Sequence, residues 1–496
     1  MMATRENAPS PGLEPIPGAS LRDLVRSAVI WRSGTQILGQ IITWGSTFLV
    51  IRILDPSDYG LYAMAAVILN LLSLINGFGI ANAAIREGEL RPHTIRQVFG
   101  MLVLLNAGLA AVQFAAAGMI ADYFGQPMVA DLLRVQCLLY LSNPFLALSY
   151  ALLSRQMDFR SQAQANLVSA ILGAVVALAG AWLGMGVWAL VAAPLAMFSL
   201  RAALTTHAAR AYYMPSFAFA GAGHLAKYGV TVLLGSFAWF VATQTDILLG
   251  GRLLSAAELG FYTTALFLTQ MFVTKFVPPI NEIAFAAFAR IQDDPQAIAH
   301  SFLKAVRLVF LAAMPFCLGM SAVAEPMVAV LLGDKWTEAA PVVFFLGLAM
   351  PFMGMQVVFG PAVSAIGRPG IATQTSIIAA VLLTLCYAVG LQWGMLGLAA
   401  SWLVGYPLLI AWSARLCLPV LGVSMRDYLV ALGPPLVAGA AMWAGVRLAA
   451  PAMPDLPVIV ELGSQVALGG AIYGGVMLLI ARDRVVELVE LRRARG

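Results

Sequence analysis

The chain has 496 residues, of which 61% are hydrophobic and only 11% are charged, with a mean hydropathy of +0.86. Soluble domains carry about 25% charged residues, so the composition excludes a soluble protein and indicates a membrane protein. The net charge of +5 does not point to nucleic acid, because excess Lys and Arg in membrane proteins gathers in cytoplasmic loops.

The predicted elements begin with residues 1–27, a proline-rich stretch typical of a disordered cytoplasmic tail. A membrane-spanning helix needs about 20 mostly apolar residues, and fourteen such segments follow in chain order. They are 30–52, 60–82, 98–121, 132–153, 163–184, 186–204, 228–251, 259–281, 303–324, 341–363, 371–392, 395–417, 429–449 and 458–481. Residues 482–496 form a second predicted tail. The sequence therefore predicts an all-α integral membrane protein.

Basic residues divide unequally between the two sides of the predicted membrane. With the N-terminus placed in the cytoplasm, 23 of the 29 Lys and Arg residues fall in cytoplasmic segments. The opposite side holds four, namely Arg52, Arg252, Lys335 and Arg447. This division follows the positive-inside rule. We therefore expect both termini to be cytoplasmic.

An internal repeat divides the chain. RILDPSDYGLY at 52–62 aligns without gaps with RLLSAAELGFY at 252–262. Six predicted helices separate the copies, so both have the same orientation. Parallel repeats indicate two similar bundles related by an axis along the membrane normal, with a binding site between them. We expect an N-terminal bundle at 28–210, a C-terminal bundle at 211–420 and two further helices within 421–481.

Six loop motifs carry a family resemblance. They are RILDPSDYGLYAMA, GFGIANAAIREGEL, SRQMDFRSQAQAN, LLSAAELGFYTTA, AAFARIQDDP and LLGDKWTEAAPVV, in this order along the chain. Together they resemble the oligosaccharide flippases, or polysaccharide transporters (Wzx-like), of the MOP exporter superfamily, from about residue 28 to 420.

The resemblance implies a function and partners. Such proteins move undecaprenyl-diphosphate-linked oligosaccharides from the inner to the outer leaflet of the bacterial inner membrane, for exopolysaccharide, capsule or O-antigen lipopolysaccharide synthesis. Alternating access between the two bundles is the expected mechanism. Expected partners are membrane lipids and the polymerase and export machinery of the pathway. No nucleic acid, metal or cofactor is expected.

Charged groups inside a bilayer are costly, so embedded ones are functional candidates. Five cations lie toward the cytoplasmic side of predicted helices: Arg32, Arg86, Lys227, Lys275 and Arg290. They predict a cationic vestibule suited to a lipid diphosphate, because Arg and Lys make charge-assisted hydrogen bonds to phosphate oxygens. The alternative is that cations at helix ends extend to lipid headgroups.

Asp246 is the most deeply embedded acid, and its equivalent in the first repeat is Ser46. One interpretation is that Asp246 binds a coupling proton or cation, or pairs with a lysine or arginine across the cavity. The other is an interhelical hydrogen-bond partner held by Thr243 or Thr245.

Two prolines, Pro278 and Pro279, remove backbone donors from the predicted helix 259–281 and should bend or break it.

No P-loop and no histidine pair at a metal-binding spacing occur in the sequence, so we expect no enzyme. Two rival functions stay open. One is a cation-coupled drug antiporter of the same superfamily, with Asp246 as its coupling site. The other is a membrane polysaccharide polymerase or acyltransferase.

Overall fold

The computed structural model describes residues 38–75, 92–218, 223–291, 294–454 and 456–481, which are helical apart from short connections. A helix overlaps each of the fourteen predicted spans. Within these ranges, nine helical segments are long and apolar enough to cross a membrane. The prediction of an all-helical membrane protein is confirmed. The chain forms two compact units, Met1–Ser236 and Phe237–Gly496, and the boundary falls inside helix α9 (Gly223–Leu253).

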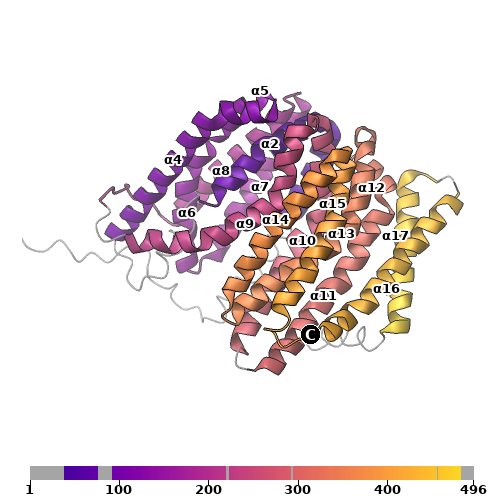
Figure 1. Cartoon of the computed structure of the whole chain (residues 1–496). Helices are drawn as coiled ribbons and strands as arrows, with labels where there is room; N and C mark the ends of the chain where they lie inside the picture. Colours follow the sequence, from indigo (N-terminus) through magenta and orange to yellow (C-terminus); the bar gives the residue numbers. More distant parts are fainter. Residues whose placement is uncertain (1–37, 76–91, 219–222, 292–293, 455, 482–496) are drawn as a thin grey trace, which may run out of the picture. The chain divides into compact units, whose positions relative to one another are not determined.

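Unit 1 is a bundle of long helices (Figure 1). Its described helices are Leu38–Ile53, α2 (Pro56–Ser73), α4 (Pro92–Phe124), α5 (Pro127–Gln136), α6 (Leu139–Arg155), α7 (Phe159–Trp182) and α8 (Val187–Ala208). α8 packs along α7 and α6, and α4 packs on α5 and α6. The short helix α5 precedes α6 with a break at Cys137 and Leu138, where the sequence predicted one helix from residue 132.

Unit 2 is organised around one buried helix, α13. Its helices after α9 are α10 (Ala256–Arg290), α11 (Pro295–Ala322), α12 (Ala324–Leu331), α13 (Ala340–Ala365), α14 (Pro369–Gly390), α15 (Gly394–Cys417), α16 (Met425–Ala449) and α17 (Val458–Ile480). α10, α11, α14 and α15 all pack on α13. The last two helices lie side by side, in yellow in Figure 1, with α16 packed on α11.

Both copies of the sequence repeat adopt the same local structure. In the first, α2 begins after Asp55, whose backbone N–H donates to Asp58 Oδ2 at 3.1 Å. In the second, α10 begins after Ser255, whose backbone N–H donates to Glu258 Oε2 at 2.9 Å. Such capping boxes satisfy backbone donors that have no partner within the helix. The repeat in the sequence is therefore a repeat of a helix–turn–helix corner.

The proline pair of α10 does not break the helix, which is continuous from Ala256 to Arg290. Its backbone is anchored on α13 on both sides of the pair. Before the prolines, Val273 is buried and lies against Gly354. After them, the Asn281 side chain donates to the Val357 carbonyl at 3.1 Å. Packing against a neighbouring helix thus offsets the lost hydrogen bonds, as membrane helices allow. Of the predicted bend or break, the structure excludes the break.

Candidate functional site

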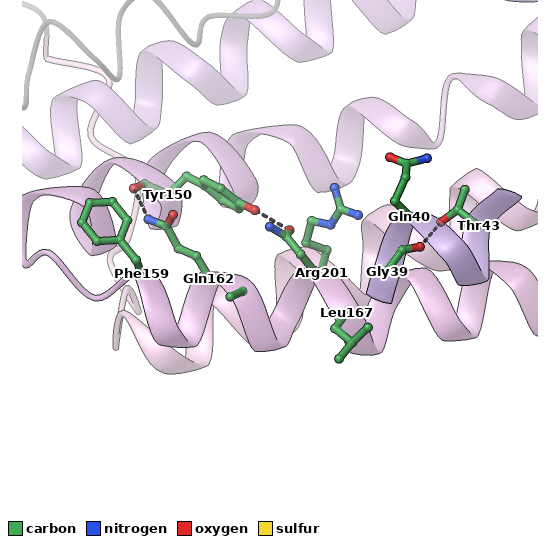
Figure 2. A pocket seen from close by; sticks show the side chains of 10 residues that line it. Gly39, Gln40, Thr43, Tyr150, Phe159, Gln162, Leu167 and Arg201 are labelled. Carbon is green, nitrogen blue, oxygen red and sulfur yellow. Dashed lines mark hydrogen bonds between the residues drawn. The ribbon is translucent and has the colours of Figure 1, made fainter. Parts of the chain in front are cut away.

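A polar cavity of about 360 Å³ lies within unit 1, among four helices (Figure 2). Its lining comprises Gly39, Gln40, Thr43, Tyr150, Phe159, Gln162, Ala163, Asn166, Leu167 and Arg201. Six of these side chains carry polar groups, and Arg201 is the only charged one among them. Polar groups are costly within a membrane and usually mark a functional pathway. This cavity is therefore the first candidate site.

Arg201 lies in α8, seven residues before its end, and is half-buried. Its Nε donates to Ser169 Oγ at 3.1 Å, and its guanidinium carbon lies 5.3 Å from the centre of the Phe198 ring. In Figure 2 the side chain extends between Tyr150 and Gln40. No described carboxylate pairs with it. The terminal guanidinium nitrogens can therefore serve a ligand.

The other polar groups of the cavity are partly pre-ordered by hydrogen bonds. The Tyr150 hydroxyl donates to Asn166 Oδ1. Gln162 Nε2 donates to Ser154 Oγ at 3.0 Å. Gln40, in contrast, makes no hydrogen bond to another described side chain, and its amide is half-buried at the cavity. The lining thus offers both donors and acceptors.

Small residues bring α7 and α8 close enough to form this site. A Cβ on Gly180 would lie 2.9 Å from the Ala189 Cβ, and one on Gly173 would lie 3.1 Å from the Met197 Cβ. Glycine at these two positions lets the helices approach closely. That approach brings Arg201 of α8 within reach of Ser169 on α7.

Asp246 belongs to a second polar cluster, which lies wholly inside unit 2. Its carboxylate is fully buried and Oδ2 accepts a hydrogen bond from the Tyr262 hydroxyl at 2.6 Å. The Tyr262 oxygen in turn accepts from Trp402 Nε1 at 2.9 Å. The Trp402 ring stacks on Tyr406 at 5.0 Å and lies 5.8 Å from Tyr387. The cluster therefore ties α9, α10, α14 and α15 together.

This arrangement corrects the predicted partners of Asp246. Thr243 and Thr245 donate to carbonyls of their own helix, those of Trp239 and Val241 respectively. They do not hold the carboxylate, and within the described residues no lysine or arginine does so. An interhelical hydrogen bond does exist, but its donor is Tyr262. Oδ1 is buried without a bond from any described side chain.

The predicted cations of the vestibule are only partly visible. Lys275 and Arg290 are both exposed on α10. They are 15 residues apart, which is about 22 Å at 1.5 Å per helical residue, so one phosphate group cannot contact both. Arg32 and Arg86 lie outside the described residues. Lys227 lies on α9, but its side chain also falls outside them.

Sequence reasoning missed two features. Arg201 is not among the predicted site residues, although it falls inside the predicted span 186–204, and that position was a usable signal. No sequence pattern identifies the partners of Asp246, because Tyr262 is 16 residues away and Trp402 belongs to a different helix.

Comparisons with known proteins identify the family. The model of the family described as "Polysaccharide biosynthesis protein" matches residues 49–341. The succinoglycan biosynthesis transport protein ExoT of Rhizobium meliloti (strain 1021) is 27% identical over 477 residues, 93% of this chain and 95% of that protein. The lipopolysaccharide biosynthesis protein WzxC of Escherichia coli (strain K12) is 24% identical and covers 83% of this chain and 85% of its own length.

Solved structures show the fold. The lipid II flippase MurJ in an inward closed conformation superposes with a TM-score of 0.75 at 14% identity, covering 92% of this chain and 100% of its own. An inward-facing multidrug resistance MATE transporter of the MOP superfamily gives a TM-score of 0.57 at 15% identity, and the match covers 80% of this chain and 99% of that transporter. The fold is that of MurJ and the MATE transporters. Because the family model spans more than half of the chain, this protein belongs to the polysaccharide biosynthesis protein family.

Proposed function

We propose that the protein translocates a polyprenyl-diphosphate-linked oligosaccharide across the bacterial inner membrane by alternating access, for exopolysaccharide, capsule or O-antigen synthesis. Family membership combined with near full-length similarity to a succinoglycan biosynthesis transport protein carries this proposal. The name of that relative denotes transport, which supports translocation rather than catalysis.

The predicted cations would receive the diphosphate. Lys275 and Arg290 are exposed on one helix about 22 Å apart, so they would contact the diphosphate successively rather than together. Arg32, Arg86 and Lys227 complete the proposed set. A membrane potential, negative inside, favours outward movement of an anion by about 2.3 kcal/mol per charge per 100 mV. For two uncompensated charges this amounts to about 5 kcal/mol at about 100 mV.

Asp246 is the proposed coupling residue for a proton or cation. A carboxylate without water is costly unless it is hydrogen-bonded or protonated, and Asp246 has one described side-chain donor for two oxygens. Uptake of a proton or cation would relieve that cost. Because the cluster joins four helices of unit 2, a change in its charge would alter their packing.

The drug-antiporter alternative shares the fold but gains no further support. Likeness to the MATE transporter at 15% identity shows the fold alone. Among the curated relatives, ExoT and WzxC both have names from polysaccharide biosynthesis. The cargo class proposed here therefore follows those relatives.

The test is to delete the gene from its host and identify the lipid-linked compounds that accumulate. We expect a polyprenyl-diphosphate oligosaccharide to accumulate and surface polysaccharide to disappear. Lys275→Ala and Arg32→Ala should fail to restore the polymer although the protein reaches the membrane. Arg368→Ala, which alters an exposed arginine at the start of α14, should restore it. Normal polymer in both Lys275→Ala and Arg32→Ala would refute the cationic vestibule.

A further inference from the structure

We propose that the unit 1 cavity around Arg201 binds one sugar ring of the cargo together with a single acidic group, either a phosphate on the anomeric carbon or a carboxylate on the sugar. This inference rests on the proposed function, since it assigns part of the cargo to a site. It goes beyond the vestibule cations, because neither Lys275 nor Arg290, the two whose side chains the structure describes, lines this cavity.

The side chains in the lining suit sugar hydroxyls. Gln40, Gln162 and Asn166 are carboxamides, and each can donate and accept hydrogen bonds. A sugar hydroxyl also does both, whereas a phosphate oxygen only accepts. A pure phosphate site would be built from donors, such as backbone N–H groups and several cations. The mixed lining therefore favours a saccharide over an isolated diphosphate.

The charge in the lining sets the number of acidic groups. Arg201 is the one cation among the ten lining residues, and no described carboxylate neutralises it. Its Nε is already engaged by Ser169. The two terminal nitrogens remain, and together they can hold two oxygens of one carboxylate or phosphate. Among the described lining residues, a second acidic group would find no second cation.

The volume of the cavity and the aromatic side chains in its lining also suit this ligand. Small-molecule sites have volumes of about 300–1,000 Å³, and 360 Å³ lies at the lower end. The cavity therefore suits a single sugar with its acidic group and not a whole oligosaccharide with its lipid. Tyr150 and Phe159 add aromatic rings to the lining, which can cover the apolar face of a sugar.

The pre-ordered lining makes the site selective. Tyr150 fixes Asn166, and Ser154 fixes Gln162, so these amides lose little freedom on binding. Gln40 has no described hydrogen bond to lose. Substituting Gln40 with Leu therefore removes a ligand contact without breaking a hydrogen bond to any described side chain, which makes it the cleanest probe of sugar binding.

The experiment is calorimetric titration of the purified full-length protein in lipid nanodiscs with glucose 1-phosphate, glucuronate, glucose and inorganic phosphate. We expect the wild type to bind both anionic sugars more tightly than glucose, and inorganic phosphate more weakly than glucose 1-phosphate. Arg201→Gln should weaken binding of the anionic sugars by about tenfold to a hundredfold, because a hydrogen-bonded charge is lost. Gln40→Leu should weaken binding of all three sugars.

The control is Arg210→Gln, an exposed arginine just beyond the end of α8 that does not line the cavity, and it should bind as the wild type does. If Arg201→Gln does not fold, Arg201→Lys keeps the charge without the planar fork and should weaken anionic sugars several-fold. Tighter binding of glucose 1-phosphate than of glucuronate would assign the group to the anomeric phosphate. The reverse order would assign it to an acidic sugar.

Three results would overturn the inference: no saturable binding of any probe by the wild type, unchanged binding of anionic sugars by Arg201→Gln, or inorganic phosphate binding as tightly as glucose 1-phosphate. None of these bears on transport itself. The proposed function fails separately, if deletion of the gene leads to no accumulated lipid-linked oligosaccharide, whatever the cavity binds.

Discussion

The hydrogen bond between Tyr262 and Asp246 should stabilise unit 2 measurably, and a double-mutant cycle with Tyr262→Phe and Asp246→Ala tests this. Both side chains are fully buried and their oxygens are 2.6 Å apart. Hydrogen bonds between membrane helices average about 0.6 kcal/mol and reach about 1.7 kcal/mol. Bonds to charged groups reach about 1.5–3 kcal/mol in proteins generally.

The upper part of the membrane range applies here for two reasons. The bond is short, and Tyr262 is itself polarised by the hydrogen bond that it accepts from Trp402 at 2.9 Å. Loss of the hydroxyl also leaves Asp246 without a described side-chain donor. We therefore expect a coupling free energy of about 1.5 kcal/mol between the two sites.

The assay is reversible unfolding in mixed micelles by titration with a denaturing detergent, with the free energy of unfolding measured for the wild type, both single variants and the double variant. Tyr62→Phe is the matched control, because Tyr62 is the repeat equivalent of Tyr262 and Ser46 stands in its repeat where Asp246 stands in the other. It should change the free energy of unfolding less than Tyr262→Phe. A coupling energy below about 0.5 kcal/mol, within the error of additivity, would refute the hydrogen-bonded cluster.

Three further predictions concern packing, coupling and capping. Gly397→Ala should lower the free energy of unfolding by about 1–3 kcal/mol, because its Cβ would lie 2.0 Å from the Gly390 carbonyl oxygen. The control Gly433→Ala has open space around its Cβ and should leave the free energy nearly unchanged in the same unfolding assay. Asp246→Asn should alter the dependence of polymer export on the proton or sodium gradient, and unchanged dependence would leave Asp246 a structural residue. Ser255→Ala should lower the free energy of unfolding by about 0.5–2 kcal/mol through loss of the α10 cap, and a value near zero would contradict that role.

Much of the fold could be predicted because hydropathy and length alone identify membrane helices. Each predicted span has its helix, and the repeat at 52–62 and 252–262 proved to be two capped corners. The short helices α5 and α12 were missed, since each has ten residues or fewer and cannot span a bilayer. The continuity of α10 through Pro278 depended on anchoring by α13, which no local pattern records.

The candidate sites were less accessible to sequence reasoning for a physical reason. A buried charge is identified by its residue type, so Asp246 could be singled out, but its partners come from helices brought together only by folding. Arg201 is the opposite case. It lies inside the predicted span 186–204 but was not among the predicted site residues, and the α8 backbone places it at a polar cavity. A cation several residues inside a predicted span merits the same attention as an acid.

The most direct measurement of the central claim is translocation by the purified protein in proteoliposomes. A fluorescent polyprenyl-diphosphate oligosaccharide is placed in the vesicle membrane, and the fraction accessible to an external glycosidase is followed over time with an imposed potential, negative inside. The account predicts that the wild type makes the labelled sugar accessible faster than protein-free vesicles do, and that Lys275→Ala does so more slowly than the wild type. Equal rates for the wild type and protein-free vesicles would contradict it.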